Sequence, residues 1–229
     1  MSDFHSQKYV DVDCSIWREY SDLSFTSCSF EGCAFSLSLD PNTRSTLSRT
    51  VLKNCQEVGC TVGPAIIEDC VIDGFETSNL FQCWGTVFKR VVLRGKIGRI
   101  MLSPAVAPGV ATPVQQQSFN VANKLFYTGV DWALDVSEGD FQECELQGIP
   151  AHLIRRDPET QVVIKRYKIL DGAWRDINLS GTHWATSIEF FLERGEDSVV
   201  LVAPKRNRRF KELLQGLQCL RKYRIAESD

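Results

Sequence analysis

Four cationic side chains directly follow one short apolar segment near the C-terminal end of the 229-residue chain. The segment "SVVLVAP" (198–204) has the β-branched composition of a buried strand. A helical pattern begins soon after it, where acidic side chains are normally preferred. A strand that leads into a helix N-terminus is also a frequent anion-binding corner. We therefore identify a candidate site for phosphate, nucleic acid or an acidic protein surface at Lys205, Arg206, Arg208 and Arg209. The alternative is a solvated basic face, partly neutralised by acidic residues of the same chain.

A second pair of cations is a weaker candidate for the same role. Arg155 and Arg156 lie in "LIRRDPET" (153–160), where they may also simply flank a turn made by Asp157 and Pro158. His183 follows Ser180 and Thr182 and could be imagined as the base of a nucleophile–base pair. Its position in the opening turn of a helix pattern favours a structural role instead.

Motifs that carry common chemistries are absent from the sequence. It contains no GxSxG, HExxH, Walker or GxGxxG pattern, and the nine cysteines form no CxxC pair. We therefore name no catalytic residue and expect no cofactor and no metal site. Whether the chain is an enzyme stays open, with a non-catalytic role favoured.

The charge distribution divides the chain into two parts. Residues 1–150 hold 11 basic and 18 acidic side chains, and residues 151–229 hold 15 and 11. The polar start "MSDFHSQKYVDVDC" does not resemble a signal peptide, and no run approaches the ~18 apolar residues of a membrane span. We expect a soluble cytoplasmic protein with reduced cysteines and no membrane partner.

A five-residue period runs through the acidic part. Large apolar residues recur at Val62, Ile67 and Ile72, and small ones two positions earlier at Cys60, Ala65 and Cys70. Counting onward in steps of five extends the first series through Thr77, Gln82, Val87, Val92, Ile97 and Leu102. The same rule holds upstream, with Cys28 and Cys33 in the small slot and Phe30 and Phe35 in the large one. A fixed period of this kind indicates stacked structural repeats.

These stretches resemble pentapeptide-repeat proteins. The resemblance implies a right-handed parallel β-helix with about four five-residue units per coil and with both series of residues inside. Each coil cannot bury its own inner face, so coils stack and similar side chains form ladders. Cysteine suits the small slot because it is a compact hydrophobe, so the resemblance gives Cys28, Cys33, Cys55, Cys60 and Cys70 a structural role.

The repeat is interrupted and then ends. We expect inserted loops at 36–49, where the register restarts shifted by two, and at 103–119, which is rich in Pro, Ala, Val and Gln. After about residue 150 the period disappears. Strands are predicted at 160–166 and 198–204 and helices at 183–195 and 208–222. The predicted fold is mainly β: a short β-helix domain over 1–150, then a small α/β unit over 151–229.

These patterns favour a non-catalytic interaction protein whose partner is a protein, with nucleic acid possible but not favoured. Some pentapeptide-repeat proteins mimic duplex DNA and bind type II topoisomerases, so the resemblance admits a modulator of that kind. An immunity or antitoxin-like role fits equally well. An enzyme or anion-binding protein that uses the basic corner is a further alternative. The oligomeric state does not follow from the sequence.

Overall fold

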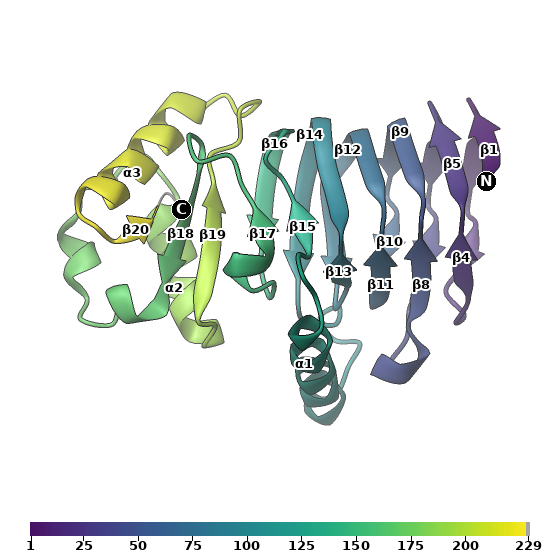
Figure 1. The fold of residues 1–229 in the computed structure, drawn as a ribbon, viewed down its shortest axis with the longest axis horizontal. Coiled ribbons are helices and arrows are strands. Elements are labelled where there is room, and N and C mark those ends of the chain that lie inside the picture. Colours follow the sequence, from purple (N-terminus) through teal and green to yellow (C-terminus); the bar gives the residue numbers. More distant parts are fainter. Residues whose placement is uncertain (228–229) are drawn as a thin grey trace.

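The computed structural model describes residues 1–227 and shows a mainly β protein in which most strand pairs are parallel (Figure 1). Over its first two thirds the chain returns repeatedly to pair with itself. Val71, for example, pairs with Val51 on one side and with Val92 on the other, 20 and 21 residues away. We call each such circuit a rung, and the set of rungs up to Arg155 the stack.

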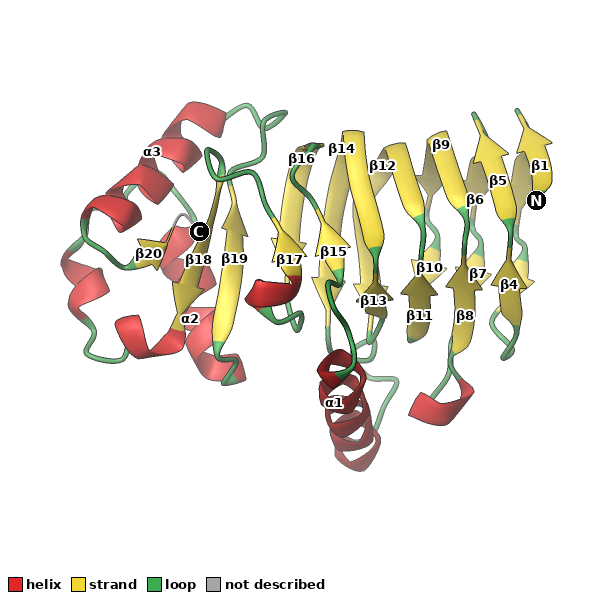
Figure 2. Cartoon of the chain, in the orientation of Figure 1, coloured by secondary structure: helices red, strands yellow, loops and turns green. Residues whose placement is uncertain are grey.

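Six rungs and the start of a seventh make up the stack (Figure 2). The first two contain four short strands each: β1 (Ser2–His5), β2 (Lys8–Val10), β3 (Asp13–Cys14) and β4 (Glu19–Ser21), then β5 (Leu23–Thr26), β6 (Ser29–Glu31), β7 (Ala34–Phe35) and β8 (Ser45–Ser48). In later rungs strands run through the corners: β9 (Val51–Val58), β10 (Thr61–Val62) and β11 (Ala65–Glu68), then β12 (Val71–Trp84) and β13 (Val87–Lys89), then β14 (Val91–Ser103). The last members are β15 (Leu134–Asp135), β16 (Gly139–Leu146) and β17 (Ile154–Arg155).

The five-residue period predicts which residues face inward as far as Ile72. Leu52, Val62 and Ile67 all line the interior. Beyond Ile72 the count is wrong at several positions, because Cys83 pairs with Val62 at a separation of 21 residues rather than 20. A shift of one residue exchanges the two faces of a strand. The interior is therefore lined by Phe81, Cys83, Phe88 and Leu93, and not by Thr77, Gln82, Val87 and Val92.

Two segments expected to be loops contain regular structure. The insertion at 36–49 is shorter than expected, because Ser45–Ser48 form β8 and pair in register with β11. What is inserted includes a short 3-10 helix, η1 (Pro41–Thr43), and it lengthens the separation between paired residues to 27, as between Ser24 and Val51. These seven extra residues are one five-residue unit plus two, which explains the shift of two.

The expected loop at 103–119 overlaps helix α1 (Pro113–Thr128). Thr112 and Gln115 form a reciprocal capping box, and Pro113 occupies the first helical turn, where its missing N–H costs nothing. The helix buries Phe119, Asn123 and Tyr127 against the stack. The Arg44 guanidinium donates to the Asn123 side-chain oxygen at 2.7 Å and so links the two insertions.

The C-terminal unit is a small antiparallel sheet covered by helices. Strand β19 (Ser198–Val202) pairs with β18 (Gln161–Lys165), and β18 pairs with β20 (Ala226–Glu227). The predicted strands and helices of this unit are confirmed, the helices as α2 (Trp184–Arg194) and α3 (Phe210–Lys222). Short 3-10 helices complete the connections: η2 (Ala151–Leu153), η3 (Arg166–Lys168) and η4 (Ala173–Asp176).

The two parts share one sheet. Leu146 of β16 pairs with Val200 of β19 in antiparallel orientation, so the C-terminal unit covers the last rung of the stack. Strand β17 still pairs in parallel with β15, which extends the stack past the boundary expected at residue 150. A separate apolar core, containing Trp174, Trp184 and Phe191, lies beneath α2 and α3.

Candidate functional site

The basic corner lies where β19 leads into α3, but its cations are largely paired within the chain. Lys205 Nζ lies 2.9 Å from Asp157, Arg206 Nη2 2.9 Å from Glu76, and Arg209 Nε 2.8 Å from Glu212. Arg208 is exposed and makes no hydrogen bond or ion pair within residues 1–227. Of the four predicted site residues, three are thus partly neutralised.

Arg206 connects the C-terminal unit to the stack. Its backbone N–H donates to the Phe141 carbonyl at 2.9 Å, and its Nη1 donates to the Ile97 carbonyl at 3.1 Å. Together with the ion pair to Glu76, these bonds hold the corner against rungs four to six. This geometry matches an internal clamp better than an open anion site.

Asp157 is positioned to hold the other side of the corner. Burial acts to raise the pKa of its carboxyl, but the hydrogen bond from Lys205 and those from the Glu159 amide and the Thr160 hydroxyl outweigh burial and lower it. The carboxylate therefore stays charged and paired at neutral pH.

The weaker candidate pair is also engaged. The Arg155 guanidinium lies 4.0 Å from the centre of the Trp132 ring and 4.0 Å from Asp135. Arg156 donates to the carbonyls of Ala151 and Ile154, both at 3.4 Å. The two side chains thus serve contacts around the turn rather than converging on a common point.

His183 packs beside Trp184, with ring centres 4.3 Å apart. Burial lowers the pKa of its imidazole. The hydroxyl of Ser180 is bonded to Asn178, and that of Thr182 to the Leu179 carbonyl. No printed contact joins His183 to either hydroxyl among the described residues, which agrees with its structural interpretation.

Many outward carboxylates of the stack are paired with a cation on the next rung. Arg49 bonds Asp22 and Arg90 bonds Asp69, each through two guanidinium nitrogens. The hydrogen bond from Arg90 lowers the pKa of the Asp69 carboxyl. Further pairs join Arg94 to Asp73, Lys8 to Glu31 and Lys89 to Glu68. The acidic character of this part is therefore partly neutralised at its surface.

Helix α1 carries an exposed apolar stripe. Val114, Val121 and Leu125 are 77%, 60% and 71% exposed. Spacings of seven and four residues place them on one helix face, opposite the face that packs on the stack. Figure 1 shows α1 projecting beyond the strands. Sequence reasoning missed this surface because it placed a loop over the first half of the helix.

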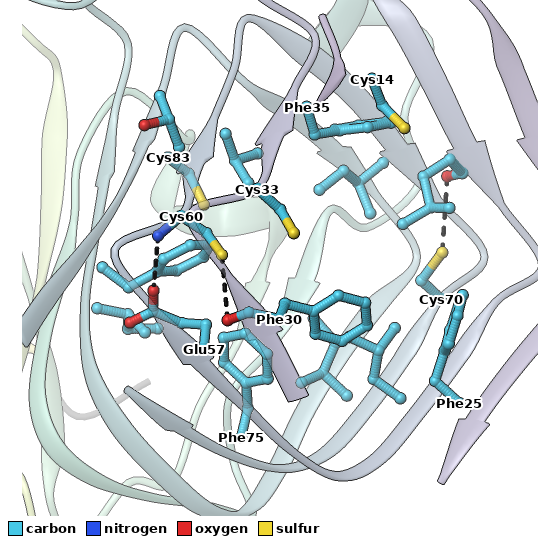
Figure 3. A pocket seen from close by; sticks show the side chains of 18 of the residues that line it. Cys14, Phe25, Phe30, Cys33, Phe35, Glu57, Cys60, Cys70, Phe75 and Cys83 are labelled. Atoms are coloured by element: carbon cyan, nitrogen blue, oxygen red, sulfur yellow. Dashed lines mark hydrogen bonds between the residues drawn. The ribbon is translucent and has the colours of Figure 1, made fainter. Parts of the chain in front are cut away.

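The interior of the stack contains an apolar cavity of about 330 Å³, shown in Figure 3. Aromatic and aliphatic side chains line it together with the sulfur atoms of Cys33, Cys60 and Cys83. Glu57 lies on the wall and is 4% exposed. Its two carboxylate oxygens accept the backbone N–H groups of Cys60 at 3.1 Å and Ser78 at 3.2 Å. The available signal for this residue was an acidic side chain in an apolar slot of the repeat.

The cysteines assigned to the ladder are inside the stack. Cys28, Cys55 and Cys70 are buried, and Cys33 and Cys60 are half-buried against the cavity. Burial raises the pKa of the Cys70 thiol to about 11 and that of Cys83 to about 12. A thiol with a raised pKa is a poor nucleophile at neutral pH, so these side chains behave as apolar packing groups.

Comparisons with protein-family models, with curated proteins and with solved structures found no match to the chain. None of the helices within residues 1–227 has both the length and the apolar character needed to cross a bilayer. In the same residues, no group of three or more His, Cys, Asp or Glu side chains could hold a metal ion.

Proposed function

We propose that this chain is a non-catalytic interaction protein built on a right-handed, pentapeptide-repeat-like parallel β-helix and acting in the cytoplasm. The architectural part is supported by pairing separations of 20 and 21 residues, which correspond to four five-residue units per coil. Inward-facing cysteines at the small positions support it as well.

The exposed stripe on α1 carries the functional part of the proposal. Scattered exposed hydrophobic residues are normal on a protein surface. Here three lie on one face of a helix inserted between rungs, and such a face is what a partner groove recognises in helix-in-groove binding. The partner is therefore proposed to be a protein with an apolar groove.

The ion pairs along the stack favour this interpretation over DNA mimicry. A DNA mimic needs unpaired negative charges along its surface, whereas Asp22, Asp69 and Asp73 are each bonded to an arginine. The corner cations are likewise paired with Asp157, Glu76 and Glu212, which leaves less charge for an external anion.

Affinity capture with matched variants tests the proposal. Val114→Gln, Val121→Gln and Leu125→Gln together remove the stripe and leave the buried face of α1 unchanged. Phe190→Gln with Leu170→Gln removes exposed apolar side chains from the C-terminal unit and serves as the control. Proteins captured by the wild type from a lysate of the encoding organism should be lost at least tenfold with the stripe variant and retained with the control. Equal capture by all three forms would refute the proposal.

A further inference from the structure

The cavity inside the stack is closed at one end and open at the other. At the C-terminal end, β19 pairs with β16 and the C-terminal unit covers the last rung. At the N-terminal end, β1 to β4 each pair only with the second rung, and no strand of the described chain pairs with their other edge. The inward side chains Tyr9, Cys14 and Phe25 remain half-exposed there, whereas Cys83 and Leu102 deeper inside are buried.

Small side chains leave the space unfilled. On the third rung, Cys55, Cys60, Ala65 and Cys70 occupy the small positions of the four sides. Glu57 holds a large position, but its carboxylate bonds to backbone N–H groups in the wall. The volume of about 330 Å³ lies within the range of roughly 300–1,000 Å³ of ligand pockets. Apolar cavities of this kind exclude water and accept apolar molecules.

The dimensions of the cavity limit what can enter it. Lining residues extend from Tyr9 on the first rung to Leu102 on the fifth, and four rung spacings of ~4.8 Å give a length of about 19 Å. Dividing the volume by this length gives a cross-section of about 17 Å². Such a channel admits one extended hydrocarbon chain and excludes fused ring systems.

The charge at the open end indicates the type of head group. The first rung carries four carboxylates, on Asp3, Asp11, Asp13 and Glu19, against the cations Lys8 and Arg18. Lys8 is also paired with Glu31 at 2.8 Å. An anionic head group at this mouth would be repelled, whereas a neutral or cationic one would not.

We propose that the stack is a binding site for a single alkyl chain with a neutral or cationic head group, which enters from the N-terminal end. This site is independent of the stripe on α1 and goes beyond the proposed protein interaction. The buried part of the ligand contacts apolar side chains and thiols, and its head group stays at the rim of the first rung.

The test uses the full chain with 1-dodecanol, dodecylamine and dodecanoate. Native mass spectrometry should show a one-to-one adduct with dodecanol, and saturating dodecanol should raise Tm, because a ligand that binds only the folded state stabilises it. Dodecylamine should bind at least as tightly as dodecanol and dodecanoate at least tenfold more weakly. Added salt should reduce the difference between the two charged ligands.

Cavity-filling variants locate the site. Cys60→Leu should raise the Kd for dodecanol at least tenfold while keeping or raising the Tm of the free protein. Val58→Leu lies on strand β9 with a 46% exposed side chain and should change neither. Cys33→Leu tests the same cavity one rung nearer the mouth if Cys60→Leu does not fold.

Three results would overturn the proposal: no one-to-one adduct with the wild type, unchanged affinity in a folded filling variant, or an equal loss of affinity in Val58→Leu. Sedimentation velocity provides a further check. A stable dimer that covers the N-terminal end and excludes dodecanol would show that a second copy, and not an alkyl chain, occupies this end.

Discussion

Replacing Arg206 by alanine tests whether the basic corner is an internal clamp or an external binding site. The substitution removes the ion pair to Glu76 and the hydrogen bond to the Ile97 carbonyl but keeps the backbone bond to Phe141. Because the Glu76 side chain is 49% exposed, the ion pair contributes only about 0.5 kcal/mol. A charged donor bonded to a buried carbonyl contributes about 1.5 kcal/mol.

The expected loss of unfolding free energy is therefore about 2 kcal/mol. For a chain of this size each kcal/mol lowers Tm by roughly 2–4 °C, so Tm should fall by about 4–8 °C. Arg208→Ala is the matched control, since Arg208 has no partner within the described residues, and its effect should stay within about 0.5 kcal/mol. Urea unfolding at low and high salt measures both, and high salt should remove mainly the ion-pair part.

A double-mutant cycle with Glu76→Ala separates the two contributions. The coupling energy between Arg206 and Glu76 should be about 0.5 kcal/mol, well below the full effect of Arg206→Ala. If Arg206→Ala were as stable as the wild type and instead weakened binding of a phosphate-bearing or acidic partner, the clamp would be the wrong interpretation and the anion-binding prediction the right one.

Three further substitutions test the packing of the molecule. Ile67→Asp should unfold the stack, because it places an unpaired charge in the core, and an unchanged Tm would remove the five-residue register. Gly216→Ala should destabilise the protein by about 1–3 kcal/mol despite a better helix propensity, since the added Cβ would lie 2.6 Å from the Trp184 ring; greater stability in urea would contradict this packing. The folded state keeps a proton on Cys70 up to a pKa of about 11, whereas the unfolded chain releases it near pH 8.5. The unfolding free energy should therefore be constant below about pH 8 and fall as pH rises from about 9 towards 11; Cys70→Ala should reduce this slope in urea titrations, and an equal slope would assign it to other groups.

The sequence determined the features that depend on local periodicity. A five-residue spacing around Val62, Ile67 and Ile72 identifies inward positions without any knowledge of the partner rung, because every unit repeats the same local geometry. The helical stripes at 183–195 and 208–222 are local in the same way. Helix α1 could have been recognised from Pro113 and the capping box of Thr112 and Gln115, had the interpretation of the 103–119 segment extended past its Pro- and Ala-rich start.

Only the tertiary structure decided which charges are available. Arg206 reads in the sequence as one of four equivalent cations, yet its hydrogen-bond partner Ile97 lies 109 residues away. The one-residue lengthening of the fourth rung likewise becomes visible only through the pairing of Cys83 with Val62. The physical reason is common to both: a period fixes what each segment does by itself, whereas pairing depends on how many residues each circuit uses before it returns. Those long-range distances determine which cations are neutralised and which surfaces stay free.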